Sequence, residues 1–356
     1  MKRKLQLGAG LLVSLLFVAL SLRGRDLPAI ARALSAANYA YLVPYFAILL
    51  AIHVVRTVRW GMLIAPLRKI PFRRLNAVCA VGFMALVVLP FRIGELGRPY
   101  LVREKGGLSG TAALASVVVE RVLDGIVVAL MLVLLLLRVS GSGREIAWVR
   151  AGGWAMFGFF AGLLAFLLLA WWQQDLALRL TRATFGRLST KLGEKLASTL
   201  ETFLSGLRAL PSWKSLAGIV AWTAVYWGIN GWGMQILARG FGIHLSLVQA
   251  YTVLGVLVIG VMIPAGPGMA GTFQYFTQLG LALFLAGGLT SARAAAYANV
   301  LWAAQFVQQV GLGLVFLFSR DLARGRHVTL GELMHAEEAM GEGGAASSRE
   351  GTVGGF

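Results

Sequence analysis

Three charged side chains interrupt one of the longest apolar stretches of the sequence. Glu120, Arg121 and Asp124 lie within residues 111–138, a run long enough for a membrane helix. Glu120 and Asp124 share a helix face, and Arg121 is three residues from Asp124. A charge at mid-bilayer costs about 2.5–3.5 kcal/mol, so these groups need partners or a wet cavity. Two interpretations stay open: a neutralised cluster that locks helices together, or a polar cavity wall that couples protons.

A second charged group lies where another apolar run ends, at Arg92, Glu95 and Arg98. The planar fork of donors on arginine suits phosphate oxygens. We predict that this segment binds a lipid headgroup. The spacing of Glu95 and Arg98 allows them to pair at i,i+3. Ordinary cytoplasmic positive charge is the alternative.

A third group, His53, Arg56 and Arg59 with Trp60, occupies one face near the end of the apolar run 41–64. Long basic side chains in such places often extend to the membrane interface, which is the alternative to a binding role. Arg56 is the deeper arginine and therefore the better candidate for a headgroup contact.

The pattern Pro-x3-Gly-x2-Gly occurs twice, each time at the end of an apolar run. Its members are Pro90, Gly94 and Gly97 in the first copy and Pro264, Gly268 and Gly271 in the second. Proline removes an amide donor, and in hydrocarbon such breaks persist only where protein or a water-filled cavity satisfies the backbone. Matched breaks in two halves of a membrane chain indicate a transporter binding site.

The second break carries no charge. Pro267, Gly268 and Gly271 present backbone dipoles, and Gln274 is the first long polar side chain after them. Free amides there would bind a polar group. Close packing of helices is the alternative.

The composition indicates an integral membrane protein. The 356 residues are 58% hydrophobic and 13% charged, with a mean hydropathy of +0.75, whereas soluble domains contain roughly 25% charged residues. The net charge of +18 sits mostly between apolar runs, the positive-inside pattern, so we expect no nucleic-acid partner. Cys79 is the only cysteine, which excludes an intrachain disulfide.

Motifs for chemistry are missing from the sequence. Its four aspartates are isolated, its four histidines are scattered, and no D-x-D, H-E-x-x-H, G-x-S-x-G or P-loop pattern occurs. We therefore expect no metal, no cofactor and no enzymatic activity.

These residues must be positioned by membrane helices. We predict an all-α polytopic protein with about eight spans, at residues 5–22, 41–64, 111–138, 152–172, 216–239, 246–263, 272–286 and 293–319. The run 76–91 is short for a span.

Basic residues give the orientation. Residues 66–74 and 173–214 are basic and are predicted to be cytoplasmic, so 76–110 begins and ends on that side. This fits a re-entrant hairpin that turns at the first break. Residues 246–286 either span twice or form a second hairpin around the second break. Two hairpins from opposite faces would form an inverted repeat.

Three further segments complete the organisation. Residues 185–207 carry an apolar stripe, which predicts an amphipathic helix at the inner interface or packed on the bundle. Residues 26–38 suggest a shorter helix of this kind on the outer face. We expect a transmembrane domain over 1–320 and a disordered cytoplasmic tail over 321–356. Both termini are then cytoplasmic.

Four stretches in this order, residues 56–60, 89–98, 120–124 and 267–271, resemble the lysylphosphatidylglycerol synthase transmembrane region family, also called the flippase-like domain family. The resemblance covers about residues 5–320. The polar residues that match the family pattern are Arg56, Arg59, Arg92, Glu95, Arg98, Glu120, Arg121 and Asp124. The resemblance implies a bacterial inner-membrane protein that moves lipids between leaflets.

The sequence departs from this family at the second break, where Gln274 stands at a position usually held by an acid. The soluble aminoacyltransferase domain of two-domain members is also missing, so we expect a stand-alone lipid translocase for a phospholipid or lipid-linked precursor. The rivals are an enzyme that transfers a group onto a lipid carrier and a non-transporting partner of an envelope-lipid synthase. The lipid, the direction, the energy source and the oligomeric state stay open.

Overall fold

The computed structural model describes residues 2–24, 26–89, 94–108, 110–137, 144–187, 213–263, 265–285 and 288–319, with 189–190, 193–194, 197 and 200–201. Within these ranges every regular element is helical, which confirms the all-α prediction. The elements are α1 (Lys2–Leu22), α2 (Leu27–Ser35), η1 (Tyr39–Tyr41), α3 (Leu42–Ile64), α4 (Phe72–Val88), α5 (Gly97–Gly106), α6 (Gly110–Leu136), α7 (Arg144–Trp172), α8 (Gln174–Phe185), α10 (Trp213–Arg239), α11 (Leu247–Val261), η3 (Pro267–Met269), α12 (Thr272–Ala282), η4 (Gly288–Thr290) and α13 (Ala292–Leu317).

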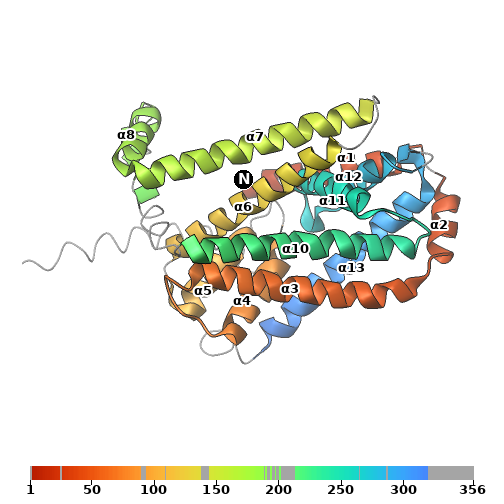
Figure 1. Cartoon of the computed structure of the whole chain (residues 1–356), viewed down its shortest axis with the longest axis horizontal. Helices are drawn as coiled ribbons and strands as arrows, with labels where there is room; N and C mark the ends of the chain where they lie inside the picture. Colours follow the sequence, from red (N-terminus) through yellow and green to blue (C-terminus); the bar gives the residue numbers. More distant parts are fainter. Residues whose placement is uncertain are drawn as a thin grey trace, which may run out of the picture.

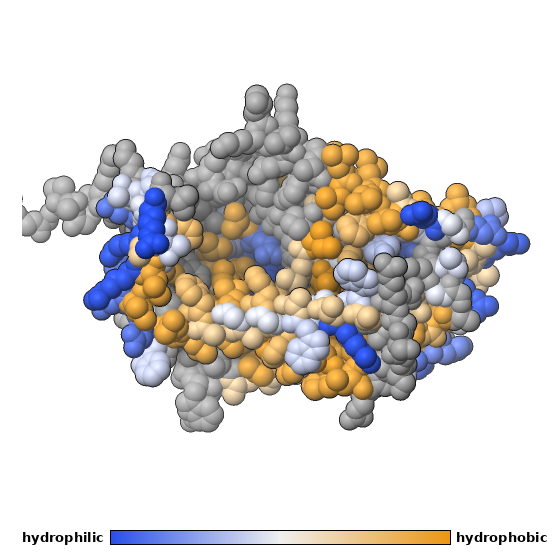
Figure 2. Space-filling view, turned by 90° about the horizontal axis from the view of Figure 1, so that it is seen from above, coloured by the Kyte–Doolittle hydropathy of each residue, from blue (hydrophilic) through white to orange (hydrophobic). Residues whose placement is uncertain are grey.

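The long helices follow the long axis of the molecule (Figure 1). Hydrophilic residues gather at the two ends of this axis, and the surface between them is largely apolar (Figure 2). Among the described residues, three helical segments are long and apolar enough to cross a bilayer: Tyr39–Ile64, Ala147–Leu169 and Ala292–Leu317. The helices α6 and α10 have 27 residues each, although charges interrupt α6. This arrangement is that of a polytopic membrane protein.

The first break joins two short helices that return to the end from which they started. The 17 residues of α4 and the 10 of α5 reach about 25 Å and 15 Å, short of a bilayer core of about 30 Å. Arg68, after α3, donates from Nη1 to the carbonyl of Gly107, after α5, at 2.7 Å. A Cβ added at Gly94 would collide with the backbone of Ala85 and Leu86, so the break folds back onto α4. The segment is a re-entrant hairpin.

The second break has the same form. The helices α11 and α12 contain 15 and 11 residues and pack against each other. Of the two alternatives for residues 246–286, the hairpin fits these lengths. It enters from the end opposite to that of the α4–α5 hairpin (Figure 1).

The packing of the helices has an internal two-fold pattern. The helix α3 packs on α10, while α4 packs on α13 and α11 packs on α6. If α3 is matched with α10, α4 with α11 and α6 with α13, each packed pair corresponds to itself or to another pair of the set. Together with the opposite entry of the hairpins, this pattern is that of an inverted repeat.

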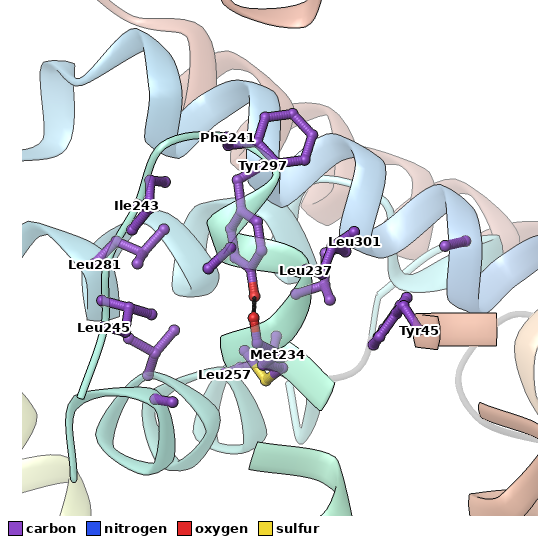
Figure 3. Packing of buried hydrophobic residues seen from close by; sticks show 14 of the residues in the cluster. Tyr45, Met234, Leu237, Phe241, Ile243, Leu245, Leu257, Leu281, Tyr297 and Leu301 are labelled. Carbon is purple, nitrogen blue, oxygen red and sulfur yellow. Dashed lines mark hydrogen bonds between the residues drawn. The ribbon is translucent and has the colours of Figure 1, made fainter. Parts of the chain in front are cut away.

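Each hairpin has its own apolar core. One core lies around Trp60, α4 and α5, and the other around Tyr297, α11 and α12. In the second core the Tyr297 hydroxyl donates to the Met234 carbonyl at 2.9 Å and so joins α13 to α10 (Figure 3). Because a buried hydroxyl needs a hydrogen-bond partner, this bond fixes how α13 and α10 are aligned with each other.

Two short helices lie at opposite ends of the molecule. On the predicted outer side, α2 begins at Asp26, whose side chain accepts from the Ala29 amide at 3.1 Å. The other is α8, which buries Ala177 and Leu178. Most of the predicted stripe over 185–207, including Leu192 and Phe203, lies outside the described residues, as does the tail 321–356.

Candidate functional site

Arg59 is the centre of a buried ion-pair network. Its Nη1 donates to Asp124 Oδ1, and its Nη2 donates to Asp124 Oδ2 at 2.9 Å and to Glu120 Oε1 at 2.7 Å. A third helix contributes Thr223, whose hydroxyl lies 3.3 Å from Nη1. Arg59 and Glu120 are each 1% exposed. The network therefore joins α3, α6 and α10 in the interior.

Arg98 brings the re-entrant hairpin into this network. It lies in the first turn of α5, directly after the break, and donates from Nη1 to Glu120 Oε2 at 2.7 Å. An added Cβ at Gly82 would meet the Arg98 side chain, so a glycine is required where α5 crosses α4. Because Glu120 accepts from Arg59 with its other oxygen, one carboxylate bridges α3 and α5.

Two tryptophans bond to α6, the helix that carries the carboxylates. Trp60 donates to Ser116 Oγ at 3.0 Å, and Trp227 donates to Asp124 Oδ1 at 3.2 Å. These bonds hold α3 and α10 against α6. Glu120 and Asp124 are thus neutralised by arginines, as in the interpretation of a cluster that locks helices together. A proton-coupling role for the same carboxylates stays a prediction.

Arg121 and Glu95 lie at the edge of the network. Arg121 Nε is 3.5 Å from Glu95 Oε1, and its Nη1 is 3.7 Å from Asp124 Oδ2. Glu95 and Arg98 could have paired at i,i+3, but Arg98 turns inward to Glu120 and Glu95 faces Arg121. Arg121 and Glu95 remain 30% and 25% exposed, so this edge is the accessible side of the network.

Arg56 differs from Arg59, Arg98 and Arg121 in having an aromatic contact but no acidic partner among the described residues. Its guanidinium carbon lies 3.8 Å from the centre of the Phe83 ring, and that of Arg98 lies 4.7 Å from the same centre. Among the described residues no carboxylate is within ion-pair distance of Arg56. The Arg56 Nε and the Arg98 Nη2 are buried there without a hydrogen-bond partner. Two cations with unused donors therefore meet on one ring.

The charges of the described site do not balance. Four arginines face three carboxylates, which leaves one positive charge in excess. The seven residues are Arg56, Arg59, Arg98, Arg121, Glu95, Glu120 and Asp124. An excess cation with free donors is suited to an anion with several acceptor oxygens, such as a phosphate diester.

The site lies within the predicted membrane. Arg56 is about 12 Å from the end of α3, and Glu120 is about 15 Å from the start of α6. Both distances are measured from the same end of the molecule, the end at which the α4–α5 hairpin enters. Nearby, His53 Nε2 contacts Asn76 Oδ1 at 2.9 Å, so this histidine has a structural partner and does not extend to the interface.

Two amides of the second break are already engaged by side chains. The Gly266 amide donates to Ser14 Oγ at 2.9 Å, and the Gly271 amide donates to Gln274 Oε1 at 2.7 Å. Trp302 donates to the Gly268 carbonyl at 2.7 Å. Gly268 and Gly271 have φ of 71° and 87°, which favours glycine. Of the two alternatives for this break, close helix packing is the one observed.

The structure brings most of the predicted charged residues together. Those that converge from α3, α5, α6 and the end of the first break are Arg56, Glu95, Arg98, Glu120, Arg121 and Asp124. Gly94 and Gly97 shape the same hairpin, whereas Pro267, Gly268, Gly271 and Gln274 belong to the other one. The predicted residues Pro90, Arg92 and Pro264 lie outside the described residues.

Two residues have larger roles in the site than the sequence indicated. Arg59 was expected as a member of the basic face with His53 and Arg56 and as a position that matches the family, yet it holds two carboxylates. Its spacing of three residues from Arg56 was the available signal. Phe83 gave none, because it is one of many apolar residues in α4. In the described ranges, no group of three or more metal-ligating side chains occurs.

One family model, described as lysylphosphatidylglycerol synthase TM region, matches residues 8–313. No curated protein and no solved structure matches the chain.

Proposed function

The chain belongs to the lysylphosphatidylglycerol synthase TM region family, and we propose that it translocates a lipid with an anionic headgroup between the leaflets of a membrane. Membership supports a membrane protein related to lipid handling. The proposal that it translocates a lipid with an anionic headgroup depends on the site described above.

One observation carries the proposal. Arg56 and Arg98 lie on one aromatic ring within the membrane, with buried donors that no described residue uses. Arg98 is paired with Glu120 through Nη1 only, and leaving the Arg56 cation without an anion in this environment is costly. A phosphate diester offers the acceptor oxygens that these guanidinium groups lack and also matches the one excess charge.

The surroundings suit a headgroup that travels while its acyl chains stay in lipid. The re-entrant hairpin carries Arg98 into the membrane, and the neighbouring Arg121–Glu95 edge is partly exposed. Figure 2 shows hydrophilic side chains at the bottom of a hollow in the apolar belt. We assign Glu120 and Asp124 to charge balance, with proton coupling as a further part of the proposal.

The proposal places the protein in the bacterial inner membrane with both termini in the cytoplasm. It needs no catalytic residue, cofactor or metal. Membrane lipids are the expected partners, and an envelope-lipid synthase is a candidate source of substrate.

The test is mass spectrometry of lipids that co-purify in mild detergent. Wild type is expected to enrich one anionic lipid class over the bulk membrane, and Arg56→Gln is expected to lose it. Arg103→Gln, a half-buried arginine on α5 paired with Glu104, is the matched control and should retain the lipid. Equal lipid content in wild type and Arg56→Gln, with both proteins folded, would contradict the phosphate site and favour a non-transporting partner.

A further inference from the structure

The helix α13 carries a row of glutamines that the headgroup site does not use. Gln305 donates to the Tyr45 hydroxyl at 3.0 Å, and Gln309 donates to the Gln305 carbonyl at 3.4 Å. Gln308 is different: it is only 7% exposed, and its Nε2 has no hydrogen-bond partner in the described structure. A buried amide donor without a partner costs about 1–3 kcal/mol, so it calls for an explanation.

The row lies between the two breaks. On one side of Gln308, Trp302 of α13 donates to the Gly268 carbonyl of the second break. On the other side, a Cβ added at Gly313 would press against Met84, one turn before the end of α4 and the first break. The second break itself contacts α4. Gln308 therefore occupies the stretch of α13 that runs from one re-entrant tip to the other.

The helices near this stretch of α13 carry few charges, and the two in α4, Arg73 and Arg74, lie in its first turn, away from the break. The helices α11 and α12 contain no charged residue, and α13 contains only Arg293, in its first turn. A charged group would find no counter-ion on these helices. An amide both donates and accepts, which is the pattern that a hydroxyl group requires.

We propose that Gln308 forms a second, neutral subsite, which hydrogen-bonds a hydroxyl of the lipid headgroup as the headgroup passes between the two breaks. This inference rests on the proposed translocation. It adds a specificity element: the arginines on Phe83 select the phosphate, and Gln308 favours headgroups with hydroxyls over those without.

The experiment compares two lipids that share the phosphate diester and differ in hydroxyls, phosphatidylglycerol and phosphatidylpropanol. Short-chain fluorescent analogues of each are placed in proteoliposomes of the full chain, and transbilayer movement is followed by albumin extraction. Wild type is expected to move phosphatidylglycerol about threefold to tenfold faster, the equivalent of one net hydrogen bond. Gln308→Leu is expected to move both at the slower rate.

The matched control is Gln309→Leu, a half-buried neighbour whose amide bonds within its own helix, and it should keep the preference. Gln308→Asn, which retains a shorter amide, covers the case in which Gln308→Leu does not fold, and it should weaken the preference. Equal rates for both lipids in wild type, or a preference that survives Gln308→Leu, would overturn the subsite and leave the translocation proposal standing. Movement of neither lipid above protein-free vesicles would overturn both.

Discussion

Arg56 and Arg59 occupy successive turns of α3, yet their surroundings differ. Arg59 contacts both carboxylates of α6, whereas Arg56 lies on Phe83 without an acidic partner among the described residues. A buried ion pair contributes little compared with an apolar replacement, but removal of one member leaves a bare charge. The two arginines should therefore respond differently to the same substitution.

We predict that Arg59→Gln destabilises the protein by about 3–5 kcal/mol, because Glu120 and Asp124 lose their shared cation. Arg56→Gln removes no ion pair and should leave the folding stability within about 1 kcal/mol of wild type. Thermal unfolding in detergent, followed by size-exclusion chromatography, measures both. Similar midpoints for the two variants would argue against the division between a structural and a binding arginine.

The sequence indicates which residues are charged within the membrane but not how they pair. Glu95 and Arg98 are close in sequence and suggested a local pair, yet Arg98 binds Glu120 of another helix. Such partners depend on where α5 crosses α4 and α6, which is a property of packing. The same holds for Phe83, whose role depends on the two cations placed over its ring.

Among the helices and their connections, the first break is defined by close contact between the backbone at Gly94 and the backbone of α4. A side chain at Gly94 would occupy the space of the Ala85–Leu86 peptide. At Gly97, three residues later, an added Cβ would make only ordinary contacts, with the Ala85 Cβ at 3.4 Å and the Gly82 backbone at 3.6 Å and beyond.

We predict that Gly94→Ala destabilises the hairpin by about 3 kcal/mol or more, because rigid backbone atoms must move apart. Gly97→Ala should be tolerated, with an ordinary van der Waals contact in place of a collision. Folded yield and thermal midpoint of the two variants provide the comparison. A Gly94→Ala protein as stable as Gly97→Ala would show that the break does not pack as described.

The first hairpin could be predicted from the sequence, because the basic residues on both sides of 76–110 require an even number of crossings. For residues 246–286 the sequence left a double span and a hairpin open. The chemistry of the second break could not. Its amides bond to Ser14 of a distant helix and to Gln274, so apparently free dipoles are satisfied by packing.

At the scale of the whole molecule, two hairpins enter from opposite ends and meet around α13. The exchange pattern of helix pairs relates α3, α4 and α6 to α10, α11 and α13. In inverted-repeat transporters, the two halves move against each other around a central site.

This arrangement predicts opposite accessibility for exposed positions at the two ends. In a Cys79→Ser background, Lys69→Cys and Glu104→Cys should react with an impermeant thiol reagent from one side of the membrane. Ser35→Cys and His244→Cys should react from the other side only. All four positions are exposed in the structure. Labelling of Lys69→Cys and His244→Cys from the same side would contradict the topology.

The most direct test of the central claim is transbilayer movement of a fluorescent phosphatidylglycerol analogue in proteoliposomes, with wild type beside Arg56→Gln. We expect movement well above protein-free vesicles for wild type. At equal folded amount, Arg56→Gln should lose about tenfold or more, since the phosphate loses the charged guanidinium donors. Equal rates for wild type and Arg56→Gln, or no movement by well-folded wild type, would contradict it.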